Sequence, residues 1–138
     1  MTRAQESLEK LLKVARADVE ALRIDLADVA RAKSSAEGSL DGLDETVRRE
    51  EAMMKEGDAA AFAAYMEGVR ARRHNLQTTL LTLGEAEDSA RDKLEAAFLE
   101  IKKLEHLIGV SERSAKKNII RDDIRTADEN FAARIRVS

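Results

Sequence analysis

Few side chains in this sequence have the types and spacing that catalysis or metal binding needs. The two histidines, His74 and His106, lie far apart, and neither has a cysteine or a second histidine one helical turn away. Asp122 and Asp123 are adjacent, so on a helix their carboxylates diverge and cannot easily share a cation. The chain has no glycine-rich phosphate loop and no cysteine. We therefore expect a protein that is not an enzyme and that has no catalytic residues, metal site or cofactor.

The single tyrosine, Tyr65, is a side chain suited to protein recognition. It precedes a basic run at 70–74, and an exposed aromatic ring beside charge is a common anchor at interfaces. Packing of the ring over the end of the structure that carries it is an equal alternative. Nucleic-acid binding is disfavoured, because segment 37–58 holds eight acids against three bases and would repel phosphate.

Two hydrophobic seams with alternating steps of three and four residues predict the elements that carry these side chains. Such spacing, sustained over many heptads, is typical of coiled-coil helices. The first seam comprises Leu8, Leu12, Ala15, Val19, Leu22, Leu26, Val29, Lys33, Ala36, Leu40, Leu43, Val47, Glu50 and Met54. The second comprises Phe62, Met66, Val69, Arg73, Leu76, Leu80, Leu83, Glu87, Ala90, Leu94, Ala97, Ile101, Leu104 and Ile108.

The two seams match each other when the second is read backwards, as in an antiparallel pair. In this register Leu8 faces Ile108 and Leu22 faces Leu94, and most layers pair two apolar residues. The absence of proline and tryptophan, with 3% aromatic residues, disfavours a layered globular core but suits a two-helix seam. The sequence thus predicts an all-α fold, a long two-helix antiparallel coiled-coil hairpin with an overhanging C-terminal helical extension.

The register places the turn of the hairpin at 57–58. Gly57 can take the left-handed conformation that ends a helix, and the Asp58 carboxylate can accept from the first amides of the next helix. We expect one helix over about residues 3–56 and a second over about 59–135. The whole chain, 1–138, is then a single hairpin domain.

Polar residues interrupt the seam and need their own explanation. Lys33, Glu50, Arg73 and Glu87 occupy seam positions, where each lowers stability relative to leucine while restricting register or partner choice. Lys33 lies one layer from Glu87, so the two can form a diagonal ion pair. The alternative is that these long side chains extend past the seam to water.

The second helix is expected to extend beyond the first, and its excess carries a new apolar stripe. Ile119, Ile120, Ile124, Phe131 and Ile135 belong to this stripe. Full burial of such a side chain is worth roughly 1.5 to 3 kcal/mol, which favours a partner surface over continued exposure. Two alternatives are that the N-terminal residues fold back over the stripe or that the tail frays.

Charge and hydropathy indicate a soluble protein. The formal net charge is −3 with 37% charged residues, which describes a solvated helical surface. No apolar run approaches the length needed to span a bilayer, and the N-terminus lacks the apolar stretch of a signal peptide. We expect a cytoplasmic protein that neither inserts into a membrane nor binds nucleic acid.

The sequence resembles the FliJ-type family of flagellar type III export proteins over almost its whole length. The resemblance lies in segment 62–69 (FAAYMEGV) after the turn and in segments 98–105 (FLEIKKLE) and 111–117 (SERSAKK) of the charged closing helix. Asp128 and Glu129 match the acidic residue that the family carries near its end.

This resemblance implies a non-enzymatic stalk in bacterial flagellum biogenesis, with links to protein transport, type III secretion and chemotaxis. The stalk would insert into the export ATPase ring and link it to the export gate, a membrane protein, with export chaperones as further partners. It would be cytoplasmic and peripheral at the membrane-embedded apparatus. The residues that match the gate-facing patch are Leu43, Tyr65 and Val69, and those on the ring-facing tail are Arg121, Ile124, Arg125 and Phe131.

Two other functions remain open from the residues alone. The chain could be a cytoplasmic coiled-coil chaperone that holds client segments against its exposed C-terminal helix. It could also be a structural spacer whose tail pairs with a second copy. Sequence does not separate the flagellar form of the stalk from the related virulence-secretion form.

Overall fold

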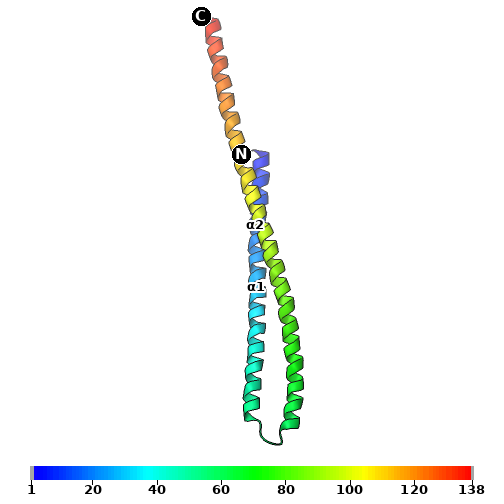
Figure 1. Ribbon diagram of the computed structural model, residues 1–138. Helices are drawn as coiled ribbons and strands as arrows, with labels where there is room; N and C mark the ends of the chain where they lie inside the picture. The colour runs from blue at the N-terminus through cyan, green and yellow to red at the C-terminus, as the bar shows by residue number, and fades with distance from the viewer. Residues whose placement is uncertain (1, 138) are drawn as a thin grey trace. The chain divides into compact units, whose positions relative to one another are not determined.

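The computed structural model describes residues 2–137 and contains two long helices. Helix α1 spans Arg3–Met53 and has 51 residues, and helix α2 spans Ala59–Val137 and has 79 residues (Figure 1). No β-strand occurs among the residues that the structure describes. The predicted all-α fold with two paired helices is confirmed.

The chain divides into two compact units, and each pairs a segment of α1 with a segment of α2. The open-end unit comprises Met1–Val19 and Ala96–Ser138, and the turn unit comprises Glu20–Glu95. The helices run in opposite directions within each unit (Figure 1). We describe the two units separately.

The core of the open-end unit follows the predicted antiparallel register. Leu12, Ala15, Leu104 and Ile108 form one buried cluster, and Leu8 and Ile101 pack against it. Residues near the start of α1 thus meet residues near position 105 of α2, as the seams require. This register is set by apolar burial, which disfavours a one-residue slip because the slip would expose the whole seam.

Helix α1 begins with a reciprocal cap, which we did not predict from the sequence. The Thr2 backbone amide donates to Gln5 Oε1 over 2.8 Å, and the Gln5 amide donates to Thr2 Oγ1 over 3.2 Å. This is the capping-box arrangement, which satisfies backbone groups that a helix start leaves without an internal partner. Gln5 is also buried.

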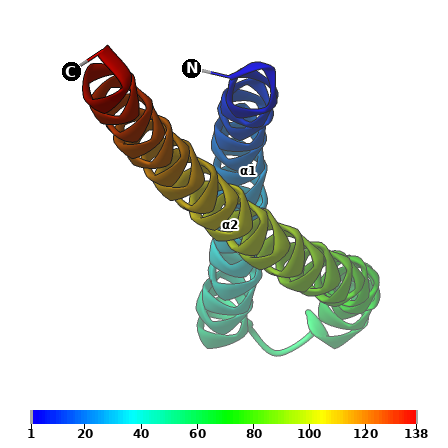
Figure 2. The same ribbon diagram turned by 90° about the horizontal axis from the view of Figure 1, so that it is seen from above.

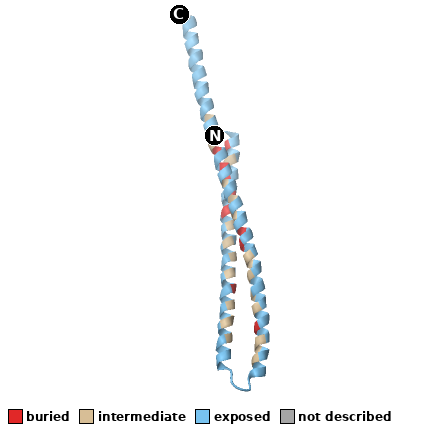
Figure 3. Cartoon of the chain, in the orientation of Figure 1, coloured by how far each residue is buried: buried red, intermediate tan, exposed pale blue. Residues whose placement is uncertain are grey.

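The turn unit has the predicted seam, but with shallower burial. Ala36, Val69 and Ala90 are buried, whereas most other seam residues are only half-buried (Figure 3). The predicted seam extended one position too far, because α1 ends at Met53, three residues before the expected end, and Met54 lies exposed in the loop. Glu50 lies within α1 and is exposed, in agreement with the alternative that the polar seam residues extend to water.

A five-residue loop, 54–58, joins the helices where a turn at 57–58 was expected (Figure 2). Gly57 has φ +98°, which confirms its predicted left-handed conformation. The Asp58 amide donates to the Lys55 carbonyl over 3.1 Å, and the Lys55 amide donates to Asp58 Oδ2 over 3.0 Å. The carboxylate therefore caps the loop, whereas we expected it to accept from the first amides of α2. Instead, the Asp58 carbonyl accepts the first helical bond, from the Phe62 amide.

Two ion pairs join the helices of the turn unit across the polar seam positions. Lys33 Nζ lies 3.5 Å from Glu87 Oε1, which Arg91 Nη2 also approaches to 3.2 Å. Arg73 pairs with Asp44, a residue that is not part of the seam. The ion-pair alternative for Lys33 is confirmed, because Glu87 is buried and needs a counter-charge.

The C-terminal part of α2 continues as a helix with every side chain from 116 to 136 exposed (Figure 3). Ile119, Ile120, Ile124 and Phe131 are each 58 to 67% exposed. The predicted overhanging extension is therefore present. Its apolar stripe is not buried by the part of the chain that the structure describes.

Candidate partner-binding site

A groove of about 630 Å³ opens between α1 and α2 in the turn unit. Three of the residues carried over from the family pattern, Leu43, Tyr65 and Val69, lie on its wall. The full lining is Ser39, Gly42, Leu43 and Thr46 from α1, and Tyr65, Gly68, Val69 and Arg72 from α2.

The position of the groove follows from the seam. Six of its eight lining residues directly precede a seam residue, three on each helix. When two helices pair in opposite directions, the residues directly before a seam residue lie on the same side of the pair in both helices. We call this side a flank. The sequence therefore contained a signal for the groove: small residues at equivalent places beside two seams.

Two glycines make the groove deep enough to accept a side chain. A Cβ atom added at Gly42 or Gly68 would meet no atom within 4 Å. Glycine weakens a helix interior, so its occurrence on both walls costs stability while it keeps the groove open. These two residues were not among the predicted site residues.

Tyr65 fits both interpretations made from the sequence, packing against its own structure and exposure at a partner-binding surface. Its ring lies 6.1 Å from that of Phe62 at an interplanar angle of 38°, and its residue is half-buried. It also lines the groove. Val69, by contrast, is only 4% exposed, and Leu43 is half-buried, so both residues also serve the seam.

The basic run after Tyr65 is split between two roles. Arg73 pairs with Asp44, which directly follows Leu43 and so faces the flank opposite the groove. Arg72 lines the groove and is exposed. A guanidinium at this place can bind a carboxylate of a partner.

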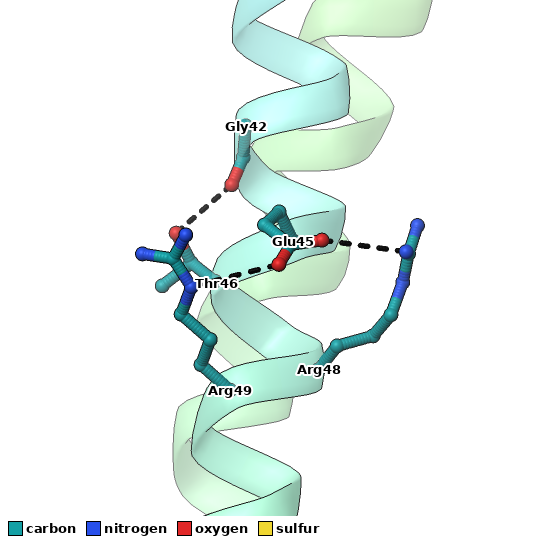
Figure 4. Close-up of polar contacts among 5 residues, drawn as sticks. All are labelled: Gly42, Glu45, Thr46, Arg48 and Arg49. Carbon is teal, nitrogen blue, oxygen red and sulfur yellow. Dashed lines mark hydrogen bonds and ion pairs between the residues drawn. The ribbon is translucent and has the colours of Figure 1, made fainter.

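On α1, polar contacts hold the charged side chains beside the groove along the helix. Glu45 accepts from Arg48 Nη1 at 3.3 Å and lies 3.5 Å from Arg49 Nε (Figure 4). The Thr46 hydroxyl donates to the Gly42 carbonyl over 2.9 Å. Such exposed ion pairs contribute little to stability.

A smaller cavity of about 260 Å³ lies beside the loop. Met53 and Met54 line it together with Phe62 and Tyr65, and Met53 is 74% exposed. Methionine adapts its shape to a partner because its side chain is unbranched and polarisable. Tyr65 belongs to both cavities, which makes the two neighbouring parts of one surface.

The other predicted site residues lie in the open-end unit, on the exposed end of α2. Ile124 and Phe131 are seven residues apart and so share a helix face, with Arg121 and Arg125 beside it. Arg125 lies 3.9 Å from both Asp122 and Glu129, at the limit of an ion pair. The structure thus groups these four residues on one helical segment of the open-end unit.

Groups that could support other chemistry are not gathered in the structure. His74 belongs to the turn unit and His106 to the open-end unit, and both are exposed. Within residues 2–137, no three histidine, cysteine or acidic side chains form a cluster able to hold a metal ion. Neither described helix has an apolar stretch of the length and hydropathy required to span a membrane.

Two curated proteins are similar to this chain. Both are named flagellar FliJ protein and come from two strains of Caulobacter vibrioides. Each is 32% identical over 100 residues, which cover 70% of this chain and 71% of the relative. No protein-family model and no solved structure matches the chain.

Proposed function

Because the chain belongs to the FliJ family of flagellar proteins, we propose that it is a non-enzymatic stalk of the flagellar type III export apparatus. In this proposal it inserts into the export ATPase ring and links the ring to the export gate. Export chaperones are further partners. The protein acts in the cytoplasm, peripherally at the membrane-embedded apparatus.

The observation that supports this proposal is the convergence of Leu43, Tyr65 and Val69 on one groove. These residues come from both helices, and the family resemblance assigns all three to the gate-facing patch. A concave surface with a half-buried aromatic ring and a charged rim has the composition of a protein-binding site. Arg72 adds an exposed cation to this patch, and we propose that it binds a carboxylate of the gate.

The exposed end of α2 is the part proposed to enter the ATPase ring. A single helix is about 10–12 Å across, so it can occupy a narrow pore that a helix pair could not. Ile124 and Phe131 would contact apolar residues of the pore, and Arg121 and Arg125 would contact acidic ones. Burial in the pore would remove the cost of exposing this stripe to water.

Two separate variants test the two contacts. Tyr65→Ala should weaken capture of the cytoplasmic part of the export gate and leave ATPase binding unchanged. Arg121→Glu combined with Arg125→Glu should weaken ATPase binding and leave gate capture unchanged. Leu81→Ala, at a residue that is 71% exposed and distant in sequence from both sites, is the matched control. If the wild-type chain neither binds the export ATPase nor changes its hydrolysis rate, the stalk proposal is wrong.

The exposed stripe also supports a second candidate, a cytoplasmic coiled-coil chaperone or spacer that binds partners through its C-terminal helix. In that case Ile124→Asp should abolish binding of an unfolded client peptide or reduce the mass of a self-associated species. Capture of the gate should then be absent in the wild type. Sedimentation of Ile124→Asp beside the wild type separates self-association from client binding.

A further inference from the structure

The open-end unit leaves several large aliphatic side chains exposed that neither the seam nor the overhanging stripe includes, and four of them, unlike Leu99, lie directly beside the seam. Leu11 and Val14 of α1 are 54% and 59% exposed, and Leu107 and Val110 of α2 are 40% and 43% exposed. They lie close in sequence to the buried cluster but take no part in it. Their positions relative to the seam show whether they form one continuous surface.

The three-and-four spacing of the second seam continues past Ile108 to Ser111, Ala115 and Asn118, and all four side chains directly precede a position of this series. Leu11 and Leu107 precede the buried Leu12 and Ile108, and Val14 precedes Ala15. Residues with this placement on two antiparallel helices face one flank, as the lining of the groove in the turn unit illustrates. The four side chains therefore form one apolar patch across both helices.

The patch is concave on its α2 side. A cavity of about 380 Å³ is lined by Leu8, Leu107 and Val110, together with small residues such as Ser114 and Ala115. Small side chains let a third helix approach closely between two others. The cavity residues all belong to the open-end unit.

The acids near this patch lie away from it. Lys103 and Lys117 directly precede seam positions and so share the flank, and Lys10 lies on the outer side next to it. The acids of the same two segments face elsewhere. Glu9, Glu105 and Glu112 directly follow seam positions, which places them on the opposite flank, and Glu6 lies on that side too.

Toward the turn, the apolar patch ends at Asp18 and Glu100, which are the nearest acids on the same flank. Between these acids and Lys117 the flank carries aliphatic side chains, serines and cations but no acid. From position 103 to 117 it extends about 21 Å along α2, equal to about four helical turns. We define the basic apolar face as Leu11, Val14, Leu107 and Val110 with Lys10, Lys103 and Lys117.

We propose that the basic apolar face binds an amphipathic α-helix of a protein partner whose aliphatic stripe is flanked by glutamate or aspartate. The groove between two helices fits a third helix, the aliphatic patch fits its stripe, and cations without neighbouring acids on this flank select acidic flanks. An anionic membrane is a poorer fit, because the surface is hollowed and carries no aromatic residue of the kind that anchors interfacial helices. This proposal does not depend on the export function, since it concerns a surface that shares no residue with the proposed gate and ring contacts.

The test uses the full chain and a fluorescent synthetic peptide of about 18 residues with leucines at helical spacing and glutamates on both sides. Its counterpart has lysine for every glutamate. Wild-type protein should bind the acidic peptide and not the basic one. Leu11→Gln combined with Leu107→Gln should weaken binding by at least about tenfold. Leu81→Gln, at a more exposed leucine of the turn unit, is the control and should bind like the wild type.

A charge swap provides the second arm. Lys103→Glu combined with Lys117→Glu should lose the acidic peptide and gain the basic one, with the helical circular-dichroism signal unchanged because both residues are exposed. Equal binding of the two peptides, or binding that survives the paired glutamine changes, overturns the proposal. Leu107-dependent binding to phosphatidylserine vesicles in place of the acidic peptide also overturns it. So does Leu107-dependent self-association that excludes the peptide.

Discussion

Replacing Leu12 by alanine should unfold the open-end unit at a lower temperature, because Leu12 is the centre of its small core. The residue is 5% exposed and belongs to the cluster with Ala15, Leu104 and Ile108. Few other contacts in this unit can compensate, since the cluster has only two half-buried neighbours, Leu8 and Ile101.

The expected loss follows from the atoms removed. Leucine to alanine deletes three carbon groups, worth about 0.8 kcal/mol each on burial, which gives about 2.4 kcal/mol. A cavity that cannot collapse raises the loss toward about 5 kcal/mol. Here the two-helix core lies one side chain from water, so neighbours can move in, and we expect about 2 to 3 kcal/mol. For a chain of 138 residues this lowers the melting temperature by about 8 °C.

Thermal and urea unfolding monitored by circular dichroism measure this loss, with Leu81→Ala as the control. Leu81 is 71% exposed, so its replacement should change stability by less than about 0.5 kcal/mol. Hydrogen exchange should localise the effect of Leu12→Ala to amides near 12 and 104. If Leu12→Ala costs no more than Leu81→Ala, the assigned core and register are wrong.

Three further changes test the loop, the cap and the groove. Gly57→Ala should destabilise the chain by about 1 kcal/mol in urea unfolding, because φ is +98° while no atom lies within 4 Å of the added Cβ, so only backbone strain is introduced. Thr2→Ala removes the capping hydroxyl and should cost about 1 kcal/mol, visible as faster hydrogen exchange in the first turn of α1; unchanged exchange contradicts the cap. Gly42→Ala and Gly68→Ala should each stabilise the helices by about 0.5 to 1 kcal/mol and yet weaken gate capture, because the new methyl groups enter open groove space. Stabilisation without loss of capture would show that the groove is not the contact surface.

The periodic part of this fold could be predicted from the sequence because burial in a two-helix pair depends on spacing alone. Leu12 and Leu104 were placed in one cluster by the matching of two seams, and the structure confirms it. The same reasoning was wrong for Met54. Heptad spacing continues through this residue, but it lies in the five-residue loop, whose length periodicity does not indicate.

Polar contacts were harder to predict, since they depend on side-chain reach rather than spacing. The Lys33 and Glu87 pair could be anticipated because both residues interrupt the seam. Asp44 could not be identified as the partner of Arg73 in this way, because it lies beside the seam, where an acid is ordinary. The Thr2 and Gln5 cap has a sequence signature that was present but was not used.

Only some of the residues that line the groove were predicted from the sequence. Leu43, Tyr65 and Val69 were chosen by family resemblance, and the structure places them together. Gly42 and Gly68 were passed over, since a glycine within a helix is more readily interpreted as a weak point than as an opening. A search for small residues at equivalent positions beside both seams would have found them.

Site-specific photo-cross-linking in flagellated cells tests the stalk proposal most directly. A photo-reactive amino acid would replace Tyr65 in the groove of the turn unit or Ile124 on the exposed end of α2, and Leu81 would serve as the background control. The proposal predicts a cross-link from Tyr65 to the export gate protein and from Ile124 to the export ATPase, with neither product from Leu81. Cross-links from both positions to the same protein, or only to a second copy of this chain, would contradict it.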